Sequence, residues 1–193
     1  MSQELAKQAD DKTLFGFWVY ILTDCVVFAC LFATFAVLRF NTFGGPGAEE
    51  LFSLPFVFVE TMLLLTSSFV CGLAILAARA KNKKQTLILL AVTFVLGLAF
   101  VGMEISEFSN LVHEGNSWQR SAFLSSFFTL VGTHGLHITV GLVWILTMGW
   151  LIYRRGLERN IIRKLLLFSL FWHFLDIVWI FIFTIVYLLG ATL

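Results

Sequence analysis

Long apolar segments separated by short polar ones repeat along the whole chain. Five of them are long enough to cross a membrane, at residues 14–38, 54–78, 86–108, 122–153 and 162–190. A helix needs about 20 apolar residues to span the hydrocarbon core, and none of the five segments alternates as a half-buried strand does. In lipid, backbone groups must bond within their own segment, which favours helices. We therefore predict an all-α membrane protein, a bundle of five transmembrane helices in a single domain over residues 1–193.

Composition narrows the class of protein further. Hydrophobic residues make up 59% of the chain and charged residues 13%, against about 25% charged residues in a soluble domain. The polar connections are too short to hold a separate soluble domain. The formal net charge of +1 gives no indication of nucleic-acid binding.

The distribution of Lys and Arg predicts the orientation in the membrane. These residues gather before the first apolar segment, between the second and third, and between the fourth and fifth. Of the 13 Lys and Arg residues, only Arg39 and Arg120 lie at the other ends of the segments. Because cytoplasmic loops are enriched in Lys and Arg, we predict a cytoplasmic amino terminus and a carboxyl terminus outside.

Ionisable residues inside the apolar segments are the main candidates for chemistry. A charge in hydrocarbon costs at least a few kcal/mol, so such residues face the bundle interior and pair with one another. We predict a buried polar network with a structural role. Its expected members are Asp24, Glu60, Glu104, Glu107, His134, His137, His173 and Asp176.

The rise of a helix places these residues at different depths. With each segment centred in the bilayer, Asp24, His137, His173 and Asp176 lie within about 5 Å of the middle. His134 lies about one turn further out. Glu60 and Glu104 lie roughly 10 Å towards the outside, and Glu107 one turn beyond them. The pattern predicts two polar layers to which all five helices contribute.

The spacing of these residues leaves three interpretations open. Three pairs are separated by three positions and share a helix face: Glu104/Glu107, His134/His137 and His173/Asp176. Carboxylate and imidazole groups at this spacing build di-iron sites in helical bundles, and two histidines on different helices can hold a haem. A proton relay is a further possibility. The structural network is the simplest interpretation, since the histidines and Glu104 lie at different depths.

Small and aromatic residues in the later segments indicate close helix packing. Glycines lie in the third segment at Gly97 and Gly102, and in the fourth around the histidines. Small residues let membrane helices approach closely, although glycine is also generally frequent in such helices. Trp172 and Trp179 lie deep in the fifth segment, and we expect them to be packing residues.

Several short motifs make the chain recognisable. They are Phe-Gly-Phe-Trp at 15–18 followed by Asp-Cys at 24–25, Leu-Pro-Phe at 54–56 followed by Glu60, Gly-Met-Glu-Ile-Ser-Glu-Phe at 102–108, Gly-Thr-His-Gly-Leu-His at 132–137, and Phe-Trp-His-Phe-Leu-Asp-Ile-Val-Trp at 171–179. Over about 15–190 the chain resembles subunit III of the haem–copper terminal oxidases. Larger members of that family have seven helices, and this chain lacks the first two. The short form, the Asp-Cys pair and Glu60 look most like the bo-type ubiquinol oxidase subunit.

The resemblance implies a function for the whole complex and a supporting role for this chain. Such a complex oxidises quinol, reduces oxygen to water and pumps protons across the bacterial inner membrane. Haem and copper belong to subunit I, so the resemblance implies no catalytic centre, cofactor or metal here. The implied partners are subunit I, subunit II, a small subunit IV and phospholipid. Asp24 matches a position where family members carry a buried carboxylate that reacts with carbodiimide.

Other functions remain open from the residues alone. A short-form cytochrome c oxidase would use a subunit III of the same kind. A membrane cytochrome would bind haem through His137 and His173, and a proton-coupled transporter would use Asp24 and Asp176. The apolar segments contain no inverted repeat or broken helix of the kind found in transporters.

Overall fold

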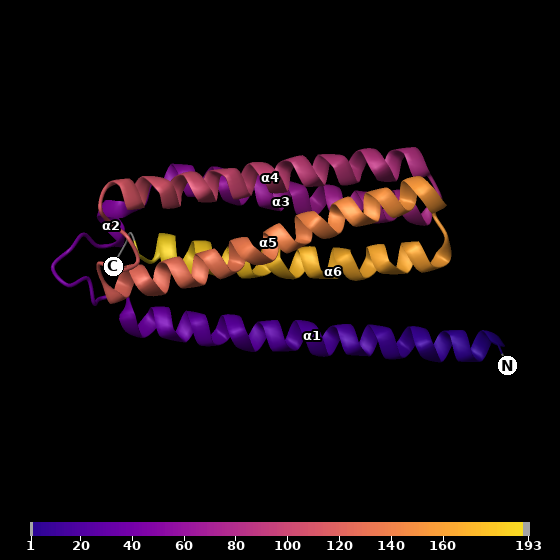
Figure 1. Ribbon diagram of the computed structural model, residues 1–193, viewed down its shortest axis with the longest axis horizontal. Coiled ribbons are helices and arrows are strands. Elements are labelled where there is room, and N and C mark those ends of the chain that lie inside the picture. Colours follow the sequence, from indigo (N-terminus) through magenta and orange to yellow (C-terminus); the bar gives the residue numbers. More distant parts are fainter. Residues whose placement is uncertain (1, 191–193) are drawn as a thin grey trace.

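All regular structure in the described part of the chain is helical. The computed structural model describes the backbone of residues 2–190, and the side chains of residues 12–190 apart from Glu49 and Glu50. The elements in chain order are α1 (Ser2–Leu38), α2 (Ala48–Leu51), α3 (Leu54–Arg79), α4 (Lys83–His113), α5 (Ala122–Arg155), α6 (Arg159–Ile182) and a π-helical turn, η1 (Phe183–Leu188) (Figure 1).

Five helical stretches are long and apolar enough to cross a membrane. They are Lys12–Leu38, Leu54–Arg79, Lys83–His113, Ala122–Arg155 and Arg159–Leu188. The predicted all-α architecture, with five helices long and apolar enough to span a membrane, is therefore confirmed. Met1 and residues 191–193 of the predicted single domain lie outside the described residues.

Local sequence signals set several helix boundaries. The Asn82 side chain accepts a hydrogen bond from the Gln85 amide at the start of α4, and Ser121 does the same for Leu124 at the start of α5. Such caps satisfy amides that have no partner within the helix. α5 ends at Gly156, whose φ of 76° is readily adopted by glycine.

The helices form a group of four with α1 alongside it. α3 packs against α4 and α6, and α5 packs against α4 and α6, so these four helices enclose a common core. α1 runs along α5 and α6 (Figure 1). The connections after α3 and after α5 lie at the same end of the bundle as the amino terminus, here called the basic end. The opposite end carries α2 and is called the α2 end.

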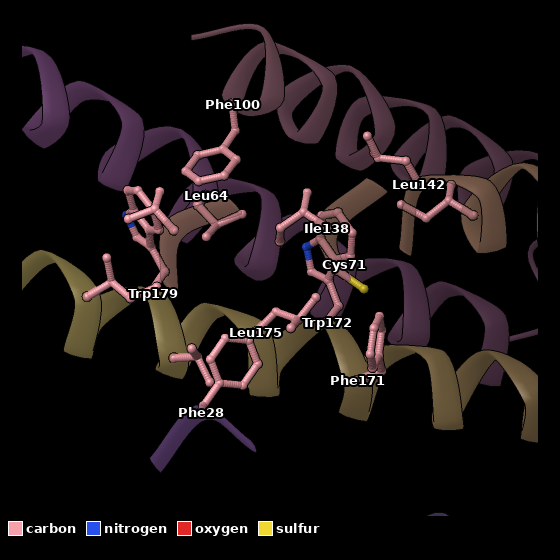
Figure 2. Close-up of a cluster of buried hydrophobic side chains, with 14 of the residues drawn as sticks. Phe28, Leu64, Cys71, Phe100, Ile138, Leu142, Phe171, Trp172, Leu175 and Trp179 are labelled. Carbon is pink, nitrogen blue, oxygen red and sulfur yellow. The ribbon is translucent and has the colours of Figure 1, made fainter. Parts of the chain in front are cut away.

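Two tryptophans of α6 fill the centre of the four-helix group. Trp172 and Trp179 are 1% and 0% exposed and project from α6 into the bundle (Figure 2). The Trp172 Nε1–H donates to the Ser67 hydroxyl at 3.1 Å, and the Trp179 Nε1–H donates to the Thr61 hydroxyl at 3.0 Å. Both hydroxyls belong to α3 and donate in turn to carbonyls of their own helix. The only polar atom of each indole is thus paired inside the core, and the expectation that both residues pack there is confirmed.

Glycines in α4 and α5 make room for Trp172. A Cβ at Gly141 would lie 2.7 Å from the Trp172 Cζ3, and a Cβ at Gly97 would lie 3.0 Å from its Cη2. The indole is therefore held between two helix backbones. By contrast, a Cβ added at Gly102 would meet no atom within 4 Å, so only some of the glycines noted in the sequence serve close packing.

α1 attaches through one stripe of side chains. Ile21, Phe28 and Phe35 are buried at helical spacing, whereas most other apolar side chains of α1 are exposed. The Phe28 ring lies 5.3 Å from the His137 ring of α5, and the Phe35 ring lies 6.1 Å from that of Phe123. These contacts set α1 against the surface that α5 and α6 present to it.

We predict that Gly141→Ala destabilises the bundle. The added methyl group would overlap Trp172, which cannot retreat because Gly97 lies on its other side. Overpacking of this kind costs about 1–3 kcal/mol. The expected result is a lower melting temperature, measured as the amount of purified protein that stays monodisperse in detergent after heating.

Gly149→Ala is the matched control in the same helix, because a Cβ there would meet no atom of a neighbouring helix within 4 Å. It should melt at or slightly above the wild-type temperature, since alanine favours the helix over glycine. Equal melting of the Gly141 variant and this control would contradict the proposed packing.

Candidate functional site

The eight ionisable residues predicted to form a network are placed in separate groups. A central pair joins α1 to α5, a serine-centred group joins α3 to α6, and a carboxylate cluster joins α3, α4 and η1. His134 lies apart from all three. The central pair is Asp24 and His137; the serine-centred group is Ser68, His173 and Asp176; the carboxylate cluster is Glu60, Glu104, Glu107 and Tyr187.

The central pair consists of a carboxylate and an imidazole that face each other between helices. His137 Nε2 lies 3.8 Å from Asp24 Oδ2, and both side chains are largely buried. His137 Nδ1 lies 2.7 Å from the Thr133 carbonyl oxygen. A carbonyl only accepts, so Nδ1 carries a hydrogen. Nε2 then faces Asp24 either with a lone pair or, in the imidazolium, with a second hydrogen. The Tyr20 hydroxyl also interacts with Asp24.

This arrangement fixes what the central pair can do. One proton placed between Asp24 and Nε2 gives either a neutral acid beside a neutral imidazole or an ion pair. Both states suit a low-dielectric interior better than an isolated charge would. The pair can therefore link α1 to α5 through an electrostatic contact.

The serine-centred group contains a residue that the sequence analysis missed. The Ser68 hydroxyl lies 2.6 Å from His173 Nδ1 and also interacts with the Asp176 carboxyl. It thereby connects α3 with two positions on α6. Serine within an apolar segment usually bonds to its own helix, so the sequence carries no signal that Ser68 reaches across.

The combination of Ser, His and Asp does not form a nucleophilic triad. In a triad the base lies between the nucleophile and the carboxylate. Here the histidine and the aspartate both interact with the serine. Ser68 is also only 5% exposed, which leaves no room for a substrate. The geometry is that of an interhelical contact.

The carboxylate cluster lies towards the α2 end of the bundle. Glu60 and Glu104 are 0% and 3% exposed. The Tyr187 hydroxyl donates to Glu107 Oε2 at 2.8 Å. The carboxyl group of Glu104 lies directly against Gly135 of α5, where a Cβ would come within 2.7 Å of Glu104 Cδ. Gly135 thus admits a carboxyl group to the backbone surface of a neighbouring helix.

His134 is enclosed by aromatic rings. It is fully buried, its ring stacks on Trp179 at 5.2 Å, and Phe100 meets it edge-on at 6.0 Å. Neither ring nitrogen has a hydrogen-bond partner within the described chain. These contacts place His134 beside Trp179 in the centre of the four-helix group, which we call the tryptophan core after Trp172 and Trp179. His134 is thereby separated from His137 of the central pair, which lies one turn further along α5.

The separation of the ionisable residues into groups gives no support to a metal site or a haem site formed by the described residues. Among the described residues, no group of three or more His, Cys, Asp or Glu side chains is placed so that it could hold a metal ion. His137 and His173, the two candidate haem ligands, belong to different groups and contact different helices.

Comparison with known proteins identifies relatives over almost the whole chain. The family described as cytochrome c oxidase subunit III matches residues 5–191. The chain is 55% identical to the cytochrome bo(3) ubiquinol oxidase subunit 3 of Pseudomonas aeruginosa, over 96% of this chain and 89% of the relative. It is 49% identical to the cytochrome c oxidase subunit 3 of a Bacillus species, strain PS3, over 91% and 84%. It is 48% identical to the quinol oxidase subunit 3 of Bacillus subtilis, over 97% and 92%.

We predict that Gly135→Ala disturbs the carboxylate cluster. The new methyl group would occupy the position of the Glu104 carboxyl. The end of a glutamate side chain can shift, so we expect destabilisation of about 1 kcal/mol, the lower limit for overpacking. Thermal denaturation of the purified protein measures this loss.

Two further variants make this prediction specific. Gly132→Ala is the control, because its Cβ would make only an ordinary contact, 3.6 Å from Phe108. Adding Glu104→Ala to the Gly135 variant removes the overlapping group and should restore part of the lost stability. If the double variant is no more stable than Gly135→Ala alone, the close approach of Glu104 is not the cause.

Proposed function

The chain belongs to the cytochrome c oxidase subunit III family, and from that membership we propose that it is subunit III of a bacterial quinol oxidase. The proposed complex oxidises quinol, reduces oxygen to water and pumps protons across the bacterial inner membrane. Relatives named for ubiquinol or quinol oxidases support this donor. The relative named for cytochrome c oxidase makes a short-form cytochrome c oxidase the second candidate.

One observation supports a structural role for the chain within that complex. Ionisable side chains in the bundle interior make polar contacts that join helices: α1 to α5, α3 to α6, and α4 to η1. We propose that the eight predicted residues serve the packing of this subunit. The single domain, over residues 1–193, would then act by covering and stabilising its neighbours.

We propose that the main neighbour is subunit I, which would hold the haem and copper centres. Subunit II, a small subunit IV and phospholipid are the other proposed partners. Helix association in membranes rests on close packing and a few hydrogen bonds. Removing this chain would therefore expose a surface of subunit I that is suited to helix packing.

We also propose that the amino terminus is cytoplasmic and the carboxyl terminus lies outside. The basic end of the bundle holds the amino terminus and both Lys- and Arg-rich connections (Figure 1). The positive-inside rule assigns such an end to the cytoplasm.

Reporter fusions test this orientation. A reporter joined after Lys84 should give a cytoplasmic signal, and one joined at Leu193 should give an external signal, because the two positions flank an odd number of spans. A cytoplasmic signal at Leu193 would contradict the proposal.

Asp24→Asn tests whether the chain takes part in the redox chemistry. Asparagine keeps the shape of the side chain and removes the charge. If the central pair is structural, the initial rate of quinol oxidation should stay close to wild type. Loss of a buried charge-assisted contact should cost about 1–3 kcal/mol of stability and show as faster loss of activity during turnover.

Cys25→Ser is a suitable control, because Cys25 is the exposed neighbour of Asp24. It should match wild type in both initial rate and lifetime. Complete and immediate loss of oxidase activity in a correctly assembled Asp24→Asn complex would show a direct catalytic role and refute the proposal.

A further inference from the structure

The carboxylate cluster contains buried oxygen atoms that the helices leave without partners. Both carboxyl oxygens of Glu60 and both of Glu104 are inaccessible and have no hydrogen-bond donor within the described chain. Buried polar groups are normally hydrogen-bonded, and an unpaired ionised carboxylate in the membrane interior is especially costly. A purely structural role accounts for the packing of the helices around Glu60 and Glu104. It does not explain why four buried carboxyl oxygen atoms have no hydrogen-bond donor within the described chain.

The groups around the cluster are other carboxyl groups and a tyrosine hydroxyl, with no Lys or Arg side chain of the described residues to neutralise a negative charge. Glu60 interacts electrostatically with Glu104 and Glu107, and Glu104 with Glu107. From η1, Tyr187 faces all three carboxyl groups. From α5, Gly135 contributes backbone, and the adjacent His134 packs against Trp179 and Phe100. Within the described part of the chain, no Lys or Arg is among the groups that act on the three glutamates.

A cavity at the α2 end of the bundle reaches Glu107 of the cluster. Its volume is about 240 Å³, and its lining includes Ser53, Glu107, Asn110 and Glu114. The last three lie on one face of α4, at spacings of three and four residues, and extend from Glu107 of the cluster towards the end of the helix. Leu51, Phe56 and Leu111 complete the lining, so the walls are part polar and part apolar. The cavity is large enough for several water molecules, each of which needs roughly 30 Å³.

The backbone of η1 is shaped around the same cluster. Tyr187 is fully buried, and its hydroxyl reaches Glu107 from a π-helical turn. Single π-turns are rare within α-helices and occur frequently at functional sites. The turn therefore brings a hydroxyl donor to a group of carboxyls that α3 and α4 leave short of donors.

We propose that Glu60, Glu104 and Glu107 form a proton-binding site that exchanges protons with the medium at the α2 end through this cavity. A hydronium ion in the cavity gives its proton to the Glu107 carboxylate and leaves water. The new carboxylic acid donates its O–H to an oxygen of Glu104 or Glu60. Passing that proton on restores the first carboxylate, so each uptake adds one proton and one positive charge to the cluster.

The site goes beyond the proposed function and does not depend on which substrate the complex oxidises. It lies apart from the central pair, which links α1 to α5. A buffer of protons at this end suits a proton-pumping assembly, which must release protons on one side. A direct spectroscopic reading of the carboxyl groups is independent of oxidase activity, so failure of the site and failure of the proposed function are distinguishable.

Infrared difference spectroscopy tests the site in the protein purified with its associated chains. The sample is reconstituted in sealed vesicles with the α2 end facing the medium. An impermeant thiol reagent on Phe43→Cys, in the exposed connection at that end, establishes the sidedness. The pH of the medium is then changed alone, and the carboxylic-acid carbonyl band is recorded in H2O and D2O before and after a protonophore is added.

The wild-type protein should show a D2O-sensitive carboxylic-acid band that responds to the external pH before the protonophore is added. Glu60→Gln and Glu104→Gln should each remove part of the band. Tyr187→Phe should displace it, because Glu107 loses its hydroxyl donor. Glu158→Gln, at an exposed glutamate of the basic end, is the control and should leave the band unchanged.

The response of the wild-type band to external pH tests the proposed proton exchange even where a glutamate variant fails to assemble. A band that changes only after the protonophore is added would mean that the site does not exchange with the α2 end, and would overturn the proposal. Absence of any pH-sensitive carboxylic-acid band, or a band unaffected by both glutamine substitutions in assembled protein, would overturn it as well.

Discussion

The insertion of two tryptophans from α6 between three other helices is the contact on which the rest of the bundle depends. Each indole brings a large apolar surface and one N–H into the interior, and an N–H without a partner there would be costly. α3 supplies a hydroxyl for each, and Gly97 and Gly141 admit the Trp172 ring. Once these contacts form, the rotation of α3 and α6 about their axes is fixed, and the positions of Ser68, His173 and Asp176 follow from it.

The sequence predicted the number and type of the elements better than it predicted their contacts. Length and apolar composition are sufficient for five helices, because hydrocarbon excludes other backbone structures. Helices that are apolar all round give little indication of which face meets which neighbour. The sequence pattern therefore did not predict that Asp24 and His173 belong to different groups, and their depth in the bilayer stays a prediction from helix rise. Ser68 and Tyr187 were missed because a hydroxyl in an apolar helix has no pattern that distinguishes a local bond from one across helices.

The separation of the polar groups has a consequence for how the subunit is held together. α1 contacts α5 and α6 through its buried stripe of Ile21, Phe28 and Phe35, and Asp24 with His137 is the contact between ionisable groups beside it. The four remaining helices share the tryptophan core and the other two polar groups. α1 therefore has fewer specific contacts than its neighbours, and its position depends most on the central pair. A change there would alter the fit of α1 while the core around Trp172 and Trp179 stays intact.

The end of α6 shows how a polar contact can override helix geometry. Trp172, Leu175, Trp179, Ile182 and Val186 recur at spacings of three and four residues, which places them on one face of a regular helix. The next residue, Tyr187, would be rotated by about 100° from that face in an α-helix. The π-turn η1 takes one more residue per hydrogen-bonded ring, so Val186 and Tyr187 are both fully buried, and the Tyr187 hydroxyl meets Glu107. The less favourable helix geometry persists because the alternative would leave Glu107 without this donor beside two other carboxyl groups. Local propensity alone would not produce this turn; the carboxylate cluster, assembled from α3 and α4, accounts for it.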